Sequence, residues 1–167
     1  ILFPYIPGNE GFEIMPGKNK ILYSGSGYLM MYDYHTLKHF TVPFDFPQDI
    51  AIDIRNLRIF IGQSKEGPEG PSETRLYVKD FNLNPLWDIS VPMLSADLEY
   101  DKQKFLYYHA RKSWYYPGFN TIYKIDTDLR KITDSLSIGH NITKIQYSRE
   151  YNRLYALNGR TDTHPGK

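Results

Sequence analysis

The chain of 167 residues contains no cysteine, and this absence removes several chemistries at once. It excludes a disulfide framework, a thiolate zinc site, an iron–sulfur cluster, a covalently attached c-type haem and a cysteine nucleophile. No apolar run approaches the roughly 18 residues that a membrane helix needs, so we expect no membrane span. The formal net charge is only +1. Since nucleic-acid binders usually present a strongly basic face, we expect no nucleic-acid partner.

Catalytic signatures are also missing. The sequence has no nucleophile elbow, no P-loop, no paired-histidine zinc motif, no dinucleotide-binding fingerprint and no calcium loop. We therefore predict no catalytic residues, no metal site and no cofactor. The chain starts at Ile1 without a signal-peptide pattern, and we expect it to be a processed or excised fragment.

Aromatic residues are abundant, with fifteen Tyr and nine Phe, and 41% of the chain is hydrophobic. This supply of apolar surface makes disorder a poor explanation for the sequence. Eleven prolines and twelve glycines would interrupt helices repeatedly, and no stretch shows sustained helical periodicity. The sequence therefore predicts an all-β protein.

Internal repetition is the most informative signal. Three segments end in an aspartate, and the spacings between Asp33, Asp80 and Asp126 are 47 and 46 residues. Short β-branched and aromatic segments recur with a similar period, at 20–23, 57–61, 104–108 and 153–157. Two further series complete each unit, one preceding (12–17, 49–54, 96–101, 143–148) and one following (38–44, 85–92, 131–139). Each unit thus predicts four short strands joined by turns rich in Asp and Asn.

Four antiparallel strands in a unit of about 40–50 residues are typical of a β-propeller blade. We expect residues 1–167 to form a single propeller segment, with blades at 12–44, 47–92 and 94–139 and a partial blade at 142–158. Closed propellers have about four to eight blades, so we expect these three and a half blades to belong to a larger, seven-bladed ring. The remaining blades would come from a missing part of the chain or from a second chain.

Residues 121–158 resemble the YVTN-type β-propeller repeat, found in lactonase-like and surface-layer-like proteins. A strand ends in Asp126-Thr127, the next closes at Gly139, and Tyr155-Ala156-Leu157-Asn158 occupies the place of the naming motif without its Val and Thr. The earlier units match this pattern more loosely. The resemblance implies a secreted, periplasmic or cell-surface location.

The loops between the second and third strands are the candidate binding elements. Residues 64–74 and 111–119 are longer than a plain hairpin loop, and in a propeller they share one face. We predict that this face binds a protein or glycan partner, because Trp and Tyr suit such recognition. The predicted binding residues are Trp114, Tyr115, Tyr116, Arg111, Lys112, His140 and Asn141. The alternative for the aromatic group is a lid folded over the neighbouring blade.

Two further functions stay open at this point. One is an enzyme or redox-enzyme subunit, lactonase-like or dehydrogenase-associated, with a site at the central channel mouth near His109 and His140. The other is a cell-surface structural component. For Asp33, Asp80 and Asp126 we predict turn or inter-strand hydrogen bonds, because they recur at one position of the blade.

Overall fold

A computed structural model describes residues 11–15, 17–25, 27–67, 70–92, 94–111, 120–138 and 142–158. The described chain is all-β, as the sequence predicts, and its strands form four antiparallel sheets in chain order. The first sheet contains β1 (Gly11–Met15), β2 (Lys20–Gly25), β3 (Tyr28–Asp33) and β4 (Lys38–Pro43). The second contains β5 (Pro47–Asp53), β6 (Arg58–Gly67), β7 (Gly70–Asp80) and β8 (Pro85–Ser90). The third contains β9 (Leu94–Tyr100), β10 (Phe105–Arg111), β11 (Asn120–Asp126) and β12 (Lys131–Ile138), and the last β13 (Ile142–Ser148) and β14 (Arg153–Asn158).

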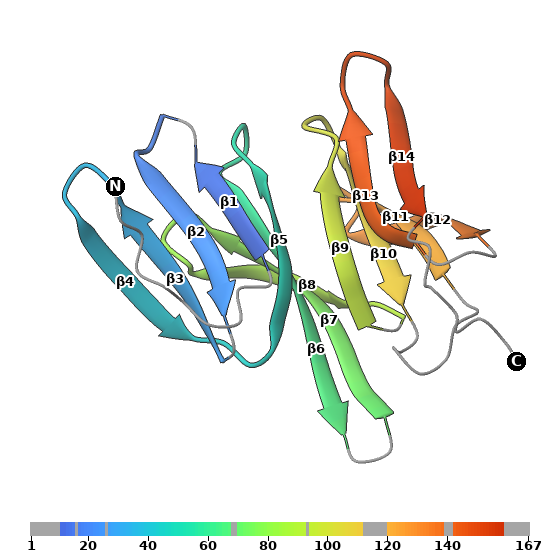
Figure 1. Ribbon diagram of the computed structural model, residues 1–167, viewed down its shortest axis with the longest axis horizontal. Helices are drawn as coiled ribbons and strands as arrows, with labels where there is room; N and C mark the ends of the chain where they lie inside the picture. The colour runs from blue at the N-terminus through green and yellow to red at the C-terminus, as the bar shows by residue number, and fades with distance from the viewer. Residues whose placement is uncertain are drawn as a thin grey trace, which may run out of the picture.

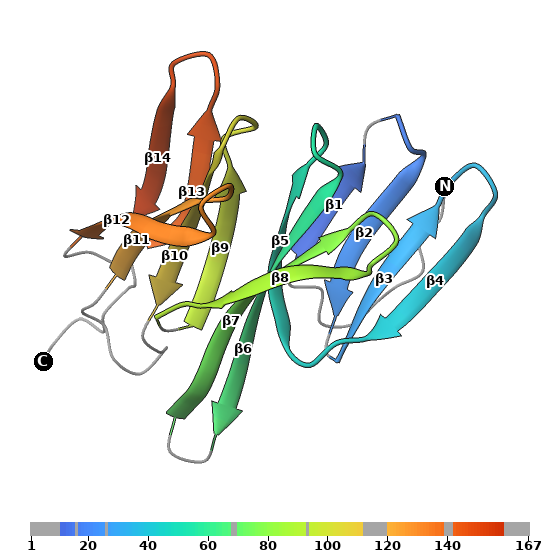
Figure 2. The same ribbon diagram turned by 180° about the vertical axis from the view of Figure 1, so that it is seen from behind.

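The sheets fan out from their first strands, which lie side by side. Contacts join β1 to β5, β5 to β9 and β9 to β13, so these inner strands form the centre of an arc (Figure 1). Each sheet is a simple meander in which neighbouring strands in sequence are hydrogen-bonded neighbours. Seen from behind, β4 lies at the outer edge of the first sheet, and β8 crosses in front of β5 (Figure 2).

Apolar side chains hold adjacent blades together in three clusters. Strand β6 is apolar on both faces because it packs between two blades. Ile59 and Ile61 pack toward the first blade, and Phe60 packs toward the third. All three side chains are fully buried. Burying each such side chain contributes about 1.5–3 kcal/mol, so contacts between blades contribute substantially to stability.

Aspartates at the ends of strands organise the turns, which confirms their predicted structural role. The Asp33 carboxylate accepts hydrogen bonds from the backbone N–H groups of His35 and Thr36, both at 2.9 Å. Asp80 and Asp126 accept equivalent bonds from the turns that follow them. These bonds satisfy donors that the sheet cannot reach.

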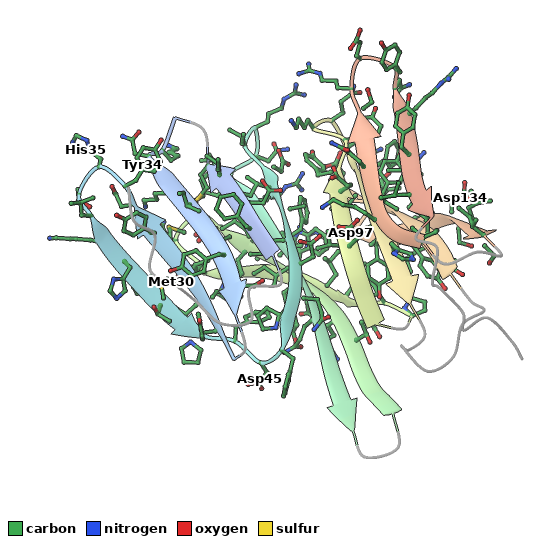
Figure 3. The ribbon with its side chains drawn as sticks, viewed as in Figure 1. Met30, Tyr34, His35, Asp45, Asp97 and Asp134 are labelled. Carbon is green, nitrogen blue, oxygen red and sulfur yellow. The ribbon has the colours of Figure 1, made fainter. Side chains whose placement is uncertain are left out.

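The two ends of the strands form two different faces. The turns β1–β2, β5–β6, β9–β10 and β13–β14 lie along the upper edge in Figure 1 and define the turn face. The ends of β2, β6, β10 and β12 lie on the opposite side, the long-loop face. In Figure 3, Tyr34 and His35 mark the turn face and Asp45 marks the long-loop face.

Residues 64–74 are not a long loop as the sequence suggested. Strands β6 and β7 continue through this segment and pair with each other as far as Gly67 and Gly70. The resulting two-stranded ribbon projects beyond its blade (Figure 1). The flanking strands do not extend along this ribbon. Strand β5 pairs with β6 only as far as Gln63, and β8 pairs with β7 only as far as Arg75. The sequence predicts a loop because Gly and Pro usually interrupt strands, but β6 and β7 continue past them with a register shift between Lys65 and Glu66.

Candidate functional site

The binding residues predicted from the sequence fall mostly outside the described part of the chain. Arg111 is the last residue of β10, and its backbone pairs with Asn120 and Leu94. The remaining six lie outside the described residues: Lys112, Trp114, Tyr115, Tyr116, His140 and Asn141. They remain predictions.

The structure shows a polar site that the sequence analysis did not single out, at the centre of the arc. Its carboxylates come from the inner strands at equivalent positions. Asp49 on β5 and Asp97 on β9 occupy one level, and Glu13 on β1 and Glu99 on β9 occupy the level two residues further toward the turn face. Side chains two residues apart on a strand point to the same side, so each strand directs its acids toward the next blade.

These aspartates satisfy the exposed edge of the following blade. An inner strand has a neighbour on only one side, and its other edge presents N–H groups without a strand partner. The Asp49 Oδ2 atom accepts the Leu98 N–H at 2.7 Å, and Asp97 Oδ2 accepts the Ile145 N–H. Glu99 similarly accepts the backbone N–H of Tyr147. The carboxylates thus act as latches between consecutive blades.

The first blade departs from this pattern at Gly11, which stands where the later blades have Asp49 and Asp97. A Cβ atom on Gly11 would lie 2.9 Å from the Ile50 nitrogen and 3.0 Å from Asp49 Oδ1. The first distance is shorter than real Cβ contacts show and the second is tighter than most of them, so β1 could not approach β5 as closely with a larger residue unless a neighbour shifted. Gly11 therefore makes room for the Asp49 carboxylate.

Burial raises the pKa of these acids, and neighbouring acids add to the rise for Asp97 and Glu13. Burial, followed by a hydrogen bond to the Asp49 carboxyl group, raises the pKa of Asp97 to about 7. Burial also raises the pKa of Asp49. The pKa of Glu13 rises to about 7 because of burial and then the charges of Asp49 and Glu99. Two carboxylates close together cannot both ionise easily, so the centre of the arc can take up or release protons near neutral pH.

A pocket of about 320 Å³ opens beside these acids. It brings together residues of four inner strands and of two turns on the turn face. Its lining residues are Glu13, Ala51, Ile52, Leu98, Glu99, Tyr100, Lys102, Gln146, Tyr147 and Arg149. The pocket therefore combines half-buried carboxylates, exposed cations and a few apolar residues.

The described histidines and acidic residues do not form a metal site. His109 is fully buried inside β10, where it lies opposite Asp97 in the register. Its position is next to a register shift between His109 and Ala110 rather than at the end of the strand. Within the described ranges, no group of three or more His, Cys, Asp or Glu side chains could hold a metal ion. No described helix is long and apolar enough to cross a membrane.

A sequence signal for the central acids did exist. In residues 96–101 an acid alternates with apolar residues, at Asp97 and Glu99, on a strand otherwise suited to burial. Such alternation places both acids on one side of the strand. The sequence could not show that Glu13 from another blade faces the same space, because that depends on how the blades meet.

Sheets of four antiparallel strands arranged around their inner strands define a β-propeller. No family model matches the sequence, and no curated protein matches it. Among solved structures, the chain is similar to the β-propeller domain of Cps50 (Swd1) from Myceliophteria thermophila, with a TM-score of 0.65 and 14% sequence identity. The match covers 90% of this chain and 49% of that one, so this chain spans about half the length of the solved domain.

Proposed function

We propose that the chain is part of a non-catalytic binding module that contacts a protein or glycan partner through its long-loop face. The observation that carries this proposal is the β6–β7 ribbon, which extends beyond its blade on that face (Figure 1). An extension beyond the blade contributes little to the blade core, whereas a binding surface benefits from such reach.

We expect the predicted contact residues on the same face, because the strands that flank them end there. Trp114, Tyr115 and Tyr116 are in the connection between β10 and β11, and both strands reach the long-loop face at Arg111 and Asn120. Lys112 follows Arg111 in this connection, and His140 and Asn141 join β12 to β13. Aromatic and cationic side chains are the residue types enriched in the most important contacts of interfaces.

The test compares two aromatic variants on opposite faces. Trp114→Ala should weaken binding to the strongest ligand of a glycan array or a peptide array by roughly tenfold or more. Tyr151→Ala is the matched control, because Tyr151 is 61% exposed on the turn face. Equal binding by both variants would contradict the proposal. A large fall in the melting temperature of Trp114→Ala would instead support the lid alternative.

We also propose that further blades complete the ring, from another part of the chain or from a second chain, to a total of seven. Phe12 and Ile14 support this, because 54% and 51% of their surfaces are exposed on the uncovered face of the first blade. A YVTN-type relationship and an extracytoplasmic location belong to the same proposal, and Tyr155-Ala156-Leu157-Asn158 supports them. No specific contact among the described residues favours the enzymatic or the structural alternative, so we propose neither.

A further inference from the structure

The pocket on the turn face separates charges of opposite sign. Glu13 and Glu99 reach it from β1 and β9, and both are only partly exposed. Lys102 and Arg149 reach it from the β9–β10 and β13–β14 turns, and both are exposed. Negative charge therefore lies deeper in the pocket and positive charge lies at its rim.

Of these four charged groups, Glu99 accepts the Tyr147 N–H, whereas the other three have no such contact within the described chain. Other acids near this face are engaged: Asp53 binds Arg58 at 2.7 Å and Asp126 binds Lys104 at 2.9 Å. By contrast, the Glu13 carboxylate accepts no hydrogen bond within the described chain. Lys102 and Arg149 likewise form no ion pair with a described residue. A half-buried carboxylate without a partner costs stability, so its presence needs a reason.

Part of the pocket lining is apolar and firmly held. Tyr147 lines the pocket and stacks on Tyr107 with ring centroids 5.8 Å apart and an interplanar angle of 16°. Ile52 and Leu98 form other parts of the wall, and both are buried within the contacts between blades. A pocket of about 320 Å³ lies at the small end of the range for ligand sites, roughly 300–1,000 Å³.

We propose that this pocket binds a small dipolar ligand. Its cationic head, a primary amine or a guanidinium group, would lie between Glu13 and Glu99, and its anionic group would contact Lys102 and Arg149. A short hydrocarbon spacer would lie along Tyr147. The site is on the face opposite the proposed partner surface, so the two proposals stand or fall independently.

Proton release is a second signature of the same site. The groups whose charges act on Glu13 are Asp49 and Glu99, which raise its pKa, and Lys102 and Lys144, which lower it. With burial as the main cause, the result is a pKa of about 7 in the free protein. A bound cation favours the ionised carboxylate. Binding near pH 7 should therefore release protons, and affinity should rise as pH increases from 6 to 8.

The experiment is isothermal titration calorimetry of the purified chain with 6-aminohexanoate, hexylamine and hexanoate. We expect 6-aminohexanoate to bind most tightly. Glu13→Gln should weaken its binding roughly tenfold or more, because a charge-assisted contact is lost. Lys102→Gln should weaken binding of 6-aminohexanoate but leave that of hexylamine nearly unchanged. The matched control is Glu150→Gln, which removes an exposed carboxylate that does not line the pocket.

Titrations in buffers of different ionisation enthalpy measure the protons released, and Glu13→Gln should reduce that number. Thermal unfolding of each variant verifies that it is folded. The proposal is overturned if none of the three compounds binds, if hexanoate binds as tightly as 6-aminohexanoate, or if Glu13→Gln and Glu150→Gln bind alike.

Discussion

One position of the inner strands is buried in the interior of the arc but exposed to solvent in the first blade. Ile50 on β5, Leu98 on β9 and Ile145 on β13 are equivalent residues, with exposures of 1%, 4% and 0%. Phe12 holds this position on β1 and is 54% exposed. The difference lies in the preceding blade, which covers Ile50, Leu98 and Ile145 but has no counterpart before β1 among the described residues.

This comparison shows that a propeller strand is not a self-sufficient unit. The apolar character of Phe12 has no use in the first blade taken alone, because large apolar side chains on a sheet face need a covering layer. The carboxylate latches also depend on a neighbouring blade. Asp49 and Asp97 accept hydrogen bonds from backbone N–H groups of the following blade rather than of their own. Stability is therefore expected to concentrate at the contacts between blades.

Removing a large interior side chain should have the largest effect. Phe60→Ala should lower the free energy of unfolding by about 3–5 kcal/mol, because Phe60 is fully buried between the second and third blades. Phe12→Ala is the matched control and should cost less than about 1 kcal/mol in the isolated chain. Urea unfolding followed by circular dichroism measures both values. Similar losses would mean that the first blade is covered in solution, which would remove the contrast.

The carboxylate latch should have the next largest effect. Asp97→Ala leaves the Ile145 N–H without its acceptor and should cost about 1–3 kcal/mol at pH 6. Gln146→Ala, next to Ile145 on β13 and exposed, should change the free energy of unfolding by less than about 0.5 kcal/mol. The same urea experiments measure both variants. A loss for Asp97→Ala no greater than that for Gln146→Ala would refute the latch.

The repeated architecture could be predicted from the sequence, and the contacts between repeats could not. Period, strand types and the turn role of Asp33, Asp80 and Asp126 are local properties, which a single unit expresses in its own residues. The latch is not local, because Asp97 and Ile145 are 48 residues apart and meet only when blades pack. The pocket is missed for the same reason, since Glu13 and Glu99 come from different blades.

The pH dependence of stability should distinguish the interior acids from ordinary surface carboxylates. The pKa of Asp97 is raised to about 7 by burial and by its hydrogen bond to Asp49, with Lys144 opposing this rise. Folding then binds a proton that the unfolded chain releases above its ordinary pKa of about 4. Stability should therefore fall as pH rises from about 5 to 8.

Melting temperatures measured across this pH range test the effect. Asp97→Asn keeps an oxygen acceptor for Ile145 but cannot ionise, so its melting temperature should depend less on pH than that of the parent chain. An unchanged slope would show that Asp97 does not titrate as the structure indicates.

The smallest expected effect concerns the turns that follow the inner strands. Each has one non-glycine residue with a left-handed backbone: Asn19, Leu57, Lys102 and Asn152, with φ between 50° and 61°. The first and last blades thus use asparagine, which tolerates this conformation, whereas the second uses leucine.

Leu57 is 46% exposed, so replacing it removes little packing. Leu57→Asn should raise the free energy of unfolding by roughly 0.5–1 kcal/mol, and Asn19→Leu should lower it by a similar amount. Paired urea unfolding curves measure both changes. A loss of stability in Leu57→Asn would mean that the Leu57 side chain contributes to blade packing, and that interior turns, like interior strands, are adapted to their neighbours.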